Sequence, residues 1–175
     1  MKSLIVLIGL LLLTNCDKDV SQQDSTTTTE EETTQATRIS KKDIESLSYA
    51  DYGLSNASRK AVSSWASYGE LEVLIQSINN ADLLYFEGDE EVMTALIQDL
   101  KTTIPDNVSN ESIIARITAL ETKFYKLKSA ERLKTTTKDE LLSAVQEFLE
   151  ASSNLNLQVN KKFEKEAQDI SKNQL

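Results

Sequence analysis

The chain has 175 residues, of which 28 are acidic and 19 basic, so its formal net charge at pH 7 is −9. This acidic balance argues against nucleic acid as a partner, because nucleic-acid-binding proteins present basic surfaces to phosphates. The sequence has no histidine and only one cysteine, Cys16. Catalytic sites that pair serine or cysteine with histidine are therefore excluded, as are zinc sites built from Cys and His.

An apolar run from Leu4 to Leu13 follows Lys2 and ends three residues before Cys16. Its ten residues are too few to cross a bilayer, because a spanning helix needs about 20. A positive charge followed by roughly 7–15 apolar residues is the pattern of a secretory signal peptide. We therefore expect residues 1–15 to be a signal peptide, which leaves the position of the cysteine to be explained.

The run ends in Leu13-Thr14-Asn15-Cys16, which resembles the lipobox of bacterial lipoproteins. The resemblance implies cleavage before Cys16, acylation of this cysteine, and a protein anchored to a membrane without spanning it, since two or three acyl chains hold stably. Asn15 departs from the commoner Gly, Ala or Ser, although lipoproteins of the Bacteroidota often carry Asn or Ser there. The alternative is a cysteine buried in an ordinary signal peptide. No cofactor, metal or catalytic group is expected.

Asp17-Lys18-Asp19, directly after the cysteine, resembles the short lysine-acid export signal of some Bacteroidota lipoproteins. The resemblance implies the outer membrane, with the body on the cell surface. The match is partial, because one acid follows the lysine instead of two. The alternatives are a solvated linker start and a body on the periplasmic face.

Residues 16–37 contain the candidate lipidation site and a segment rich in threonine and acids. Such a segment cannot bury enough apolar surface to offset the entropy of ordering, so we expect a flexible tether. Within it, Asp24-Ser25-Thr26 resembles the motif at which Bacteroidota glycosylate exported proteins, which makes Ser25 a candidate O-glycosylation site. Bare linker is the alternative. The remaining residues, 38–175, are expected to form one helical domain.

Helical spacing of apolar residues begins after residue 38. A minor helix is expected to start at Ser40, with Asp43 in a capping box, and to end at Gly53. A long helix should begin near Asn56 and stop at Gly88, with Gly69 marking a bend or a close crossing. Its stripe consists of Ala61, Trp65, Tyr68, Glu72, Ile75, Ile78 and Asp82.

Three further helices follow. The first should run from Asp89 to about Thr103, with Val92, Leu96, Asp99-Leu100 and Thr103 on its inner face. Pro105 then predicts a turn. The second, capped by Ser109 or Asn110, should reach about Leu133 with the inner stripe Ile113, Ile117, Leu120, Phe124 and Leu127.

The last helix should open at the capping box Thr137-x-x-Glu140 and continue for about 35 residues, almost to the C-terminus. Its stripe is Leu141, Val145, Phe148, Ser152, Leu155, Val159, Lys162/Phe163 and Ile170. Residues 154–160, NLNLQVN, alternate like a strand, but both flanks favour helix. Short loops between helices predict an all-α, antiparallel up-and-down bundle of about four main helices.

Four polar residues near the apolar stripes are candidates for a buried polar layer: Arg116, Asn154, Asn156 and Asn160. Such a layer would fix helix register or line a ligand pocket, with plain exposure as the alternative. Aromatic residues gather in the first half and predict either core or an exposed partner-binding patch: Tyr49, Tyr52, Trp65, Tyr68, Tyr85 and Phe86.

Most of residues 45–166 is similar to stretches of uncharacterised helical lipoproteins of flavobacteria and their relatives. The resemblance brings no activity with it. The expected function is therefore a non-enzymatic, membrane-anchored envelope lipoprotein that acts as a protein-interaction or structural module, with an unknown envelope or extracellular protein as its partner. The alternative is a carrier of a small apolar ligand or lipid in a cavity between the helices.

Overall fold

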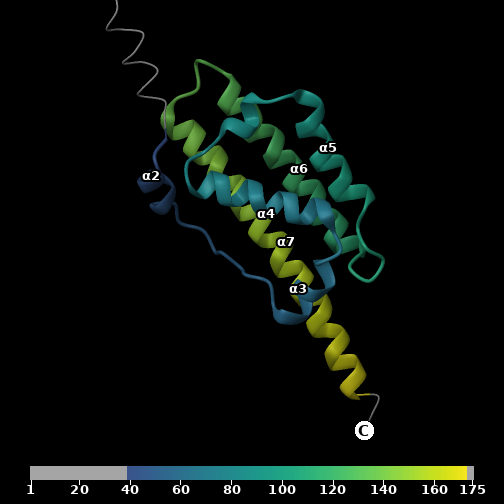
Figure 1. The fold of residues 1–175 in the computed structure, drawn as a ribbon. Helices are drawn as coiled ribbons and strands as arrows, with labels where there is room; N and C mark the ends of the chain where they lie inside the picture. The colour runs from purple at the N-terminus through teal and green to yellow at the C-terminus, as the bar shows by residue number, and fades with distance from the viewer. Residues whose placement is uncertain (1–38, 173–175) are drawn as a thin grey trace, which may run out of the picture.

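The computed structural model describes residues 39–172, with side chains up to residue 169, and every regular element in this range is helical (Figure 1). The predicted all-α class is confirmed. The elements are α2 (Lys41–Glu45), α3 (Asn56–Val62), α4 (Ala66–Asn79), the 3-10 helix η1 (Leu84–Glu87), α5 (Glu90–Thr102), α6 (Glu111–Arg132) and α7 (Lys138–Lys172).

The helices α6 and α7 form an antiparallel hairpin that is the centre of the bundle. The predicted capping box opens α7, because the Thr137 backbone N–H donates to Glu140 Oε2 over 2.8 Å and the Glu140 N–H donates to Thr137 Oγ1 over 3.3 Å. Further along, Glu147 of α7 binds Lys123 and Lys126 of α6. These contacts align the C-terminal half of α6 with the N-terminal half of α7.

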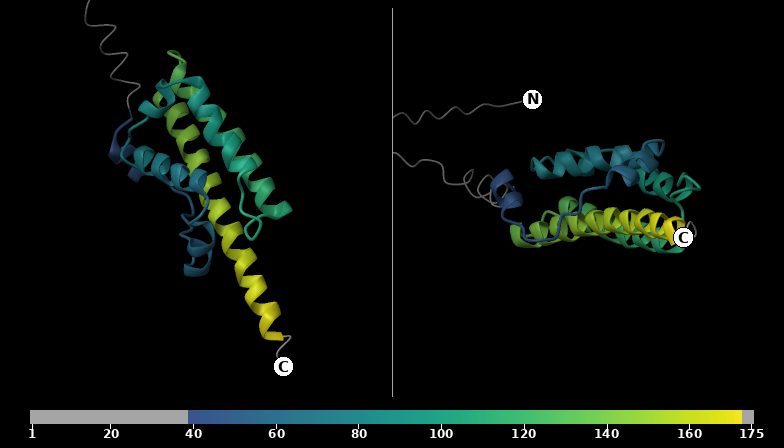
Figure 2. Two further views of the ribbon diagram at one scale, coloured as in Figure 1. Left: turned by 45° about the vertical axis from the view of Figure 1, so that its right-hand side comes forward. Right: turned by 90° about the horizontal axis from the view of Figure 1, so that it is seen from below.

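The remaining main helices continue the up-and-down path. Glu90 at the start of α5 pairs with Lys128 near the end of α6, and Ser67 at the start of α4 lies 3.1 Å from Thr103 just after α5. Seen from below, α4 lies in a separate layer over the α6–α7 pair (Figure 2). The α5–α6 and α6–α7 pairs therefore run in opposite directions, as the short loops predict, whereas α4 crosses α6 and α7 at an angle (Figure 1).

The core is centred on the buried faces of α6 and α7. Every residue of the predicted α6 stripe is at most 1% exposed, and the α7 stripe from Leu141 to Val159 is also buried. Phe124 of α6 packs against Phe86 of η1 and Phe148 of α7, with ring centroids 5.4 and 6.2 Å apart. Side chains from three elements thus interlock at one aromatic cluster.

The prediction of one long helix from Asn56 to Gly88 is wrong, because this range forms three separate elements, α3, α4 and η1. The chain leaves the helical path at Ser63–Trp65, where Trp65 becomes the N-cap of α4 with a non-helical backbone and stacks on Tyr68. Gly69 neither bends α4 nor touches a neighbour, since a Cβ added there would meet nothing within 4 Å.

The end of α4 is a Schellman motif with alanine in the position that usually holds glycine. The Asp82 N–H donates to the Ser77 carbonyl and the Ala81 N–H to the Ile78 carbonyl. Ala81 has φ 59°, which places it in the left-handed region. Alanine gives no sequence signal for such a turn, so the predicted stop at Gly88 lies seven residues too far along the chain.

The inner face of α5 is also different from the predicted one. The structure buries Met93, Leu96, Ile97 and Leu100, whereas Val92 is 60% exposed. The two apolar residues at positions 92 and 93 lie about 100° apart around the helix, so the pattern alone does not decide which of them faces the core. In the structure α5 packs against α4 and α6, and Met93 is the residue of this pair that is buried.

The first helix begins as predicted and ends earlier. Ser40 and Asp43 form the expected capping box, but α2 ends at Glu45 and not at Gly53. Residues 46–55 then run to α3 without regular secondary structure. We call residues 46–55 the strap.

Candidate functional site

The strap lies along α7, and polar side chains of α7 bind its backbone. Ser153 provides the first two bonds: its Oγ accepts from the Tyr52 N–H over 2.7 Å and donates to the Ala50 carbonyl over 2.6 Å. In an extended chain, groups of residues 50 and 52 point to the same edge. The serine therefore takes the place that a neighbouring strand would occupy.

Two asparagines continue this recognition beyond Tyr52. Asn156 Nδ2 donates to the Tyr52 carbonyl over 3.0 Å, and Asn160 Nδ2 donates to the Gly53 carbonyl over 2.9 Å. Asn160 Oδ1 also accepts from the Ser55 N–H over 2.8 Å. Carboxamides suit this task because each carries both a donor and an acceptor.

Gln146 extends the set towards the start of α7, where its Nε2 donates to the Ser48 carbonyl over 3.0 Å. Residues 48–55 span about 23 Å when extended at about 3.3 Å each, and residues 146–160 of α7 span about 21 Å at about 1.5 Å each. The two lengths match, so the strap runs parallel to α7. We call Gln146, Ser153, Asn156 and Asn160 the polar row.

The polar row explains the strand-like alternation in NLNLQVN. Asn156 and Asn160 are four residues apart and face the strap, while Leu155 and Val159 are four residues apart and fully buried. Two stripes offset by one residue lie about 100° apart around a helix. The alternation thus comes from two adjacent helical faces, one polar and one apolar.

Asn156 also joins the strap to α4. Its Oδ1 accepts a hydrogen bond from the Tyr68 hydroxyl over 2.6 Å. Burial raises the pKa of Tyr68, so the hydroxyl remains protonated and available as a donor. The Tyr68 ring stacks on Trp65 with centroids 5.5 Å apart, and Trp65 Nε1 is the buried side-chain polar atom without a partner in the described part of the chain. The Asn156 side chain therefore connects the strap to α4.

The structure separates the four candidates for a polar layer. Asn156 and Asn160 are half-buried and bind the strap, whereas Asn154 is half-buried and lies outside these contacts. Arg116 is exposed, so its assignment to a buried layer is wrong. Arg116 lies about 60° around the helix from Ile113, at the edge of the buried stripe, where its side chain is exposed.

Ser153 and Gln146 were missed in the sequence analysis. The spacing of Ser153, Asn156 and Asn160 by three and four residues places them on one helix face and could have indicated a shared role. No comparable signal marked the strap, because its backbone is recognised and not its side chains. The remaining candidate sites lie outside the described residues: Cys16, Asp17, Lys18, Asp19 and Ser25.

The N-terminal end of the strap is fixed through α2. Lys138 of α7 lies 2.8 Å from Asp43, and Lys41 donates to Asn80 over 3.2 Å. The Lys138 ammonium, with the hydroxyl and backbone N–H of Ser40, holds the pKa of Asp43 well below its usual range. The Ile44 side chain is buried beneath α2 and adds an apolar anchor.

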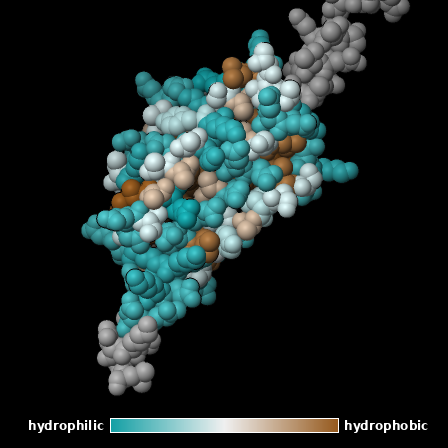
Figure 3. Space-filling view, turned by 180° about the vertical axis from the view of Figure 1, so that it is seen from behind, coloured by the Kyte–Doolittle hydropathy of each residue, from teal (hydrophilic) through white to brown (hydrophobic). Residues whose placement is uncertain are grey.

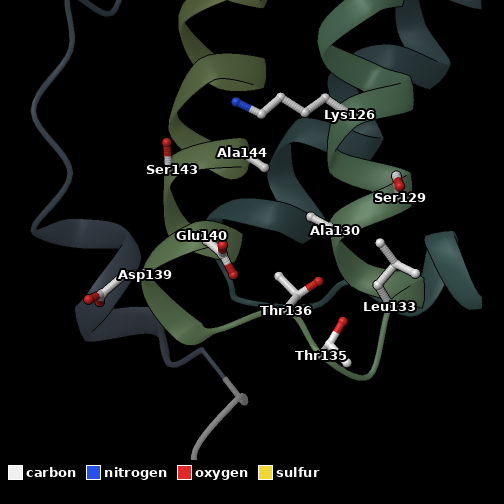
Figure 4. Close-up of a pocket in the computed structure, with 10 residues that line it drawn as sticks. All are labelled: Lys126, Ser129, Ala130, Leu133, Thr135, Thr136, Asp139, Glu140, Ser143 and Ala144. Atoms are coloured by element: carbon white, nitrogen blue, oxygen red, sulfur yellow. The ribbon is translucent and has the colours of Figure 1, made fainter.

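A surface hollow of about 770 Å³ lies at the turn between α6 and α7 (Figure 4). Its lining residues are Lys126, Ser129, Ala130, Leu133, Thr135, Thr136, Asp139, Glu140, Ser143 and Ala144. It is open to solvent. Lys126 binds Glu147 and Glu140 closes the α7 capping box, which leaves Asp139 as an acid without a free base beside it in the lining. The hollow therefore brings together no free acid and base for catalysis.

The aromatic residues of the first half contribute mainly to the core, which is the first of the two alternatives expected from the sequence, and they do not form an exposed patch. Trp65, Tyr68 and Phe86 are buried, Tyr49 and Tyr85 are half-buried, and Tyr52 is 39% exposed. The face in Figure 3 is mostly hydrophilic, with its apolar residues in small separate groups. Isolated exposed apolar residues are normal for a folded surface, so most of these aromatic residues contribute to the core.

The described residues contain no helix that is both long and apolar enough for a membrane span, and no group of three acids arranged for a metal ion. Comparison of the chain with protein-family models, curated proteins and solved structures found no match.

Proposed function

We propose that this protein is a non-enzymatic envelope lipoprotein, anchored to a membrane through Cys16, whose helical body acts as an interaction or structural module. The observation that carries the proposal is the single cysteine of the sequence, which lies three residues after an apolar run too short to cross a bilayer. Diacylglycerol on this cysteine would hold the body at the membrane without a spanning helix.

Two features support a role without catalysis. The sequence has no histidine to act as a general base near neutral pH. The most organised polar set among the described residues, the polar row, is bound to the protein's own backbone. The side chains that converge most closely are therefore used to hold the fold together.

A carrier of small apolar ligands receives less support than an interaction module. Ligand pockets usually bury most of the ligand within an apolar wall. The hollow at the α6–α7 turn is open and contains Lys126, Asp139 and Glu140 beside its apolar residues. The space between the helices is filled by buried side chains, including Phe86, Phe124 and Phe148.

We further propose an outer-membrane location with the body at the cell surface. Asp17-Lys18-Asp19 would serve as the export signal, and Ser25 would accept a glycan. Residues 17–37 could separate the body from the lipid by up to about 70 Å, at about 3.3 Å per residue. Such a distance suits a protein that must reach a partner beyond a layer of surface sugars.

Metabolic labelling with a fatty acid tests the anchor. The wild-type protein should incorporate the label, whereas Cys16→Ala should not. Ser21→Ala, a substitution in the same segment away from the lipobox, is the matched control and should be labelled normally. Equal labelling of wild type and Cys16→Ala would refute the lipoprotein proposal.

Protease treatment of intact cells tests the location. External protease should remove the body of the wild type, and a variant with alanine at Lys18 and Asp19 should be protected. If the wild type is digested only after lysis, the body faces the periplasm and the surface location is wrong.

A further inference from the structure

The strap and α2 are attached to the helices by polar contacts near the surface and by a small number of apolar side chains. Six hydrogen bonds join the strap backbone to Gln146, Ser153, Asn156 and Asn160. Only Ile39 and Ile44 are buried apolar residues in this part of the chain, and Leu47, Tyr49 and Leu54 are half-buried. Polar contacts exposed to water stabilise a fold much less than a closed apolar core does.

The helices behind the strap contain most of the apolar core, to which Ile39 and Ile44 also belong. The buried faces of α4, α5, α6 and α7 contact one another through residues such as Ile78, Leu100, Leu120 and Phe148, which are fully buried. Of the 27 buried apolar residues in this core, 25 lie between Val62 and Val159, and only Ile39 and Ile44 belong to the segment before α3. Loss of the strap would therefore leave the main core in place, which is the condition for a local opening of low free energy.

The contacts of the strap are distributed so that its two ends depend on each other. Asp43 and Lys138 fix the start, Ser153 and Asn156 fix the middle, and Asn160 fixes the end at Gly53 and Ser55. Because one extended chain connects these points, loosening one end lowers the effective concentration of the others. The segment should therefore attach and detach as a whole.

We propose that residues 39–55 are a releasable latch, which detaches from α7 as one unit while the helices from α3 to α7 remain folded. This inference rests on the proposed function for its biological meaning. The latch lies directly between the proposed tether and the helices, so its release would add 17 residues to the link. At about 3.3 Å each these residues add up to about 56 Å of contour length, and the greatest reach from the membrane would rise from about 70 to about 125 Å.

Amide hydrogen exchange on the full-length, lipid-free chain tests the release itself and does not depend on the anchor. The amides of Ile44 and Tyr52 should share one opening equilibrium and exchange faster than those of Phe124 and Phe148. Asn160→Ala removes two hydrogen bonds at the far end of the strap. It should accelerate exchange at both Ile44 and Tyr52 about tenfold, as expected for about 1.4 kcal/mol, although neither residue touches Asn160.

Asn154→Ala is the matched control, because it makes the same change on the same helix outside the polar row, and it should alter neither amide. Gln146→Ala is a second test variant and should act in the same direction as Asn160→Ala. If Asn160→Ala accelerates Tyr52 and leaves Ile44 unchanged, the strap frays from one end and the latch proposal is wrong. Equal protection of Ile44, Tyr52 and Phe124 would also overturn it, since release would then require global unfolding.

Discussion

Lys138, the first residue of α7, lies 2.8 Å from the same Asp43 carboxylate that forms the capping box of α2. The carboxylate also accepts from the Ser40 N–H over 2.8 Å and from the Ser40 hydroxyl over 2.6 Å. A single ionised group therefore stabilises the start of α2 and joins this helix to α7. Its protonation should weaken both functions at once.

This relationship predicts a specific response to acid. The pKa of Asp43 is lower in the folded protein than its ordinary value of about 3.9. Its stabilising effect is therefore fully present above about pH 4 and is lost as the pH falls towards the lower folded pKa. Asp43→Asn should reduce the docking of α2 at pH 7, and the difference between variant and wild type should shrink as the pH is lowered. Amide exchange at Ile44 across a pH series, corrected for the intrinsic rate, measures this difference.

The control for this prediction is Glu45→Gln, because Glu45 also lies in α2 but does not contact Lys138. This variant should leave the pH dependence of α2 docking close to that of the wild type. A difference between Asp43→Asn and wild type that stays constant down to pH 2 would show that the ionisation of Asp43 is not responsible.

The burial of Met93 and the exposure of Val92 predict effects of very different size for these two adjacent residues of α5. Met93 is 1% exposed, so Met93→Ala should lower the free energy of unfolding by about 2–5 kcal/mol, through lost burial and a cavity. Val92 is 60% exposed, so Val92→Ala should change it by less than about 0.5 kcal/mol. Chemical denaturation of both variants measures the two values. A larger loss for Val92→Ala than for Met93→Ala would mean that α5 presents the face expected from the sequence.

The backbone conformations of Gly69 and Ala81 predict that two substitutions, Gly69→Ala and Ala81→Gly, each stabilise the protein. Gly69 lies inside α4 with open space for a methyl group, so Gly69→Ala should add about 0.5–1 kcal/mol to the free energy of unfolding. Ala81 has φ 59°, and Ala81→Gly should relieve the strain of a side chain in the left-handed region. Thermal unfolding should show a higher midpoint for each variant.

Gly88→Ala provides a contrast, because a Cβ there would lie 3.2 Å from the Tyr85 carbonyl oxygen. Crowding should offset the gain in this variant, and its midpoint should not rise. If Gly69→Ala lowers the midpoint, the helix requires glycine at this position for a contact that the isolated chain does not have.

The parts of the fold that the sequence predicts well are those determined by local signals. The capping-box residues Thr137 and Glu140 mark the start of α7, and the regular apolar stripe from Ile113 to Leu127 predicts the inner face of α6. The predictions fail where the structure is determined by contacts between side chains and not by local sequence. Trp65 interrupts a continuous apolar pattern to stack on Tyr68, and Met93 replaces Val92 because of neighbouring helices.

The candidate site was predictable only in part for the same reason. Asn156 and Asn160 attract attention as amides beside an apolar stripe, but their partners are carbonyl and N–H groups of the strap. Backbone groups are present in every residue, so no composition or periodicity identifies the segment that α7 binds. Arg116 shares the same kind of sequence environment and points to solvent, which only the orientation of α6 reveals.

The pairing of the strap with α7 has a consequence for the order of folding. The bonds between them join residues 98 to 107 positions apart, whereas those between α6 and α7 at Glu147 join residues only 21 and 24 positions apart. Closing a long loop costs more entropy, so the α6–α7 hairpin should form before the strap docks. During synthesis at about 5–20 residues per second, the strap leaves the ribosome about 5–20 s before its binding site exists.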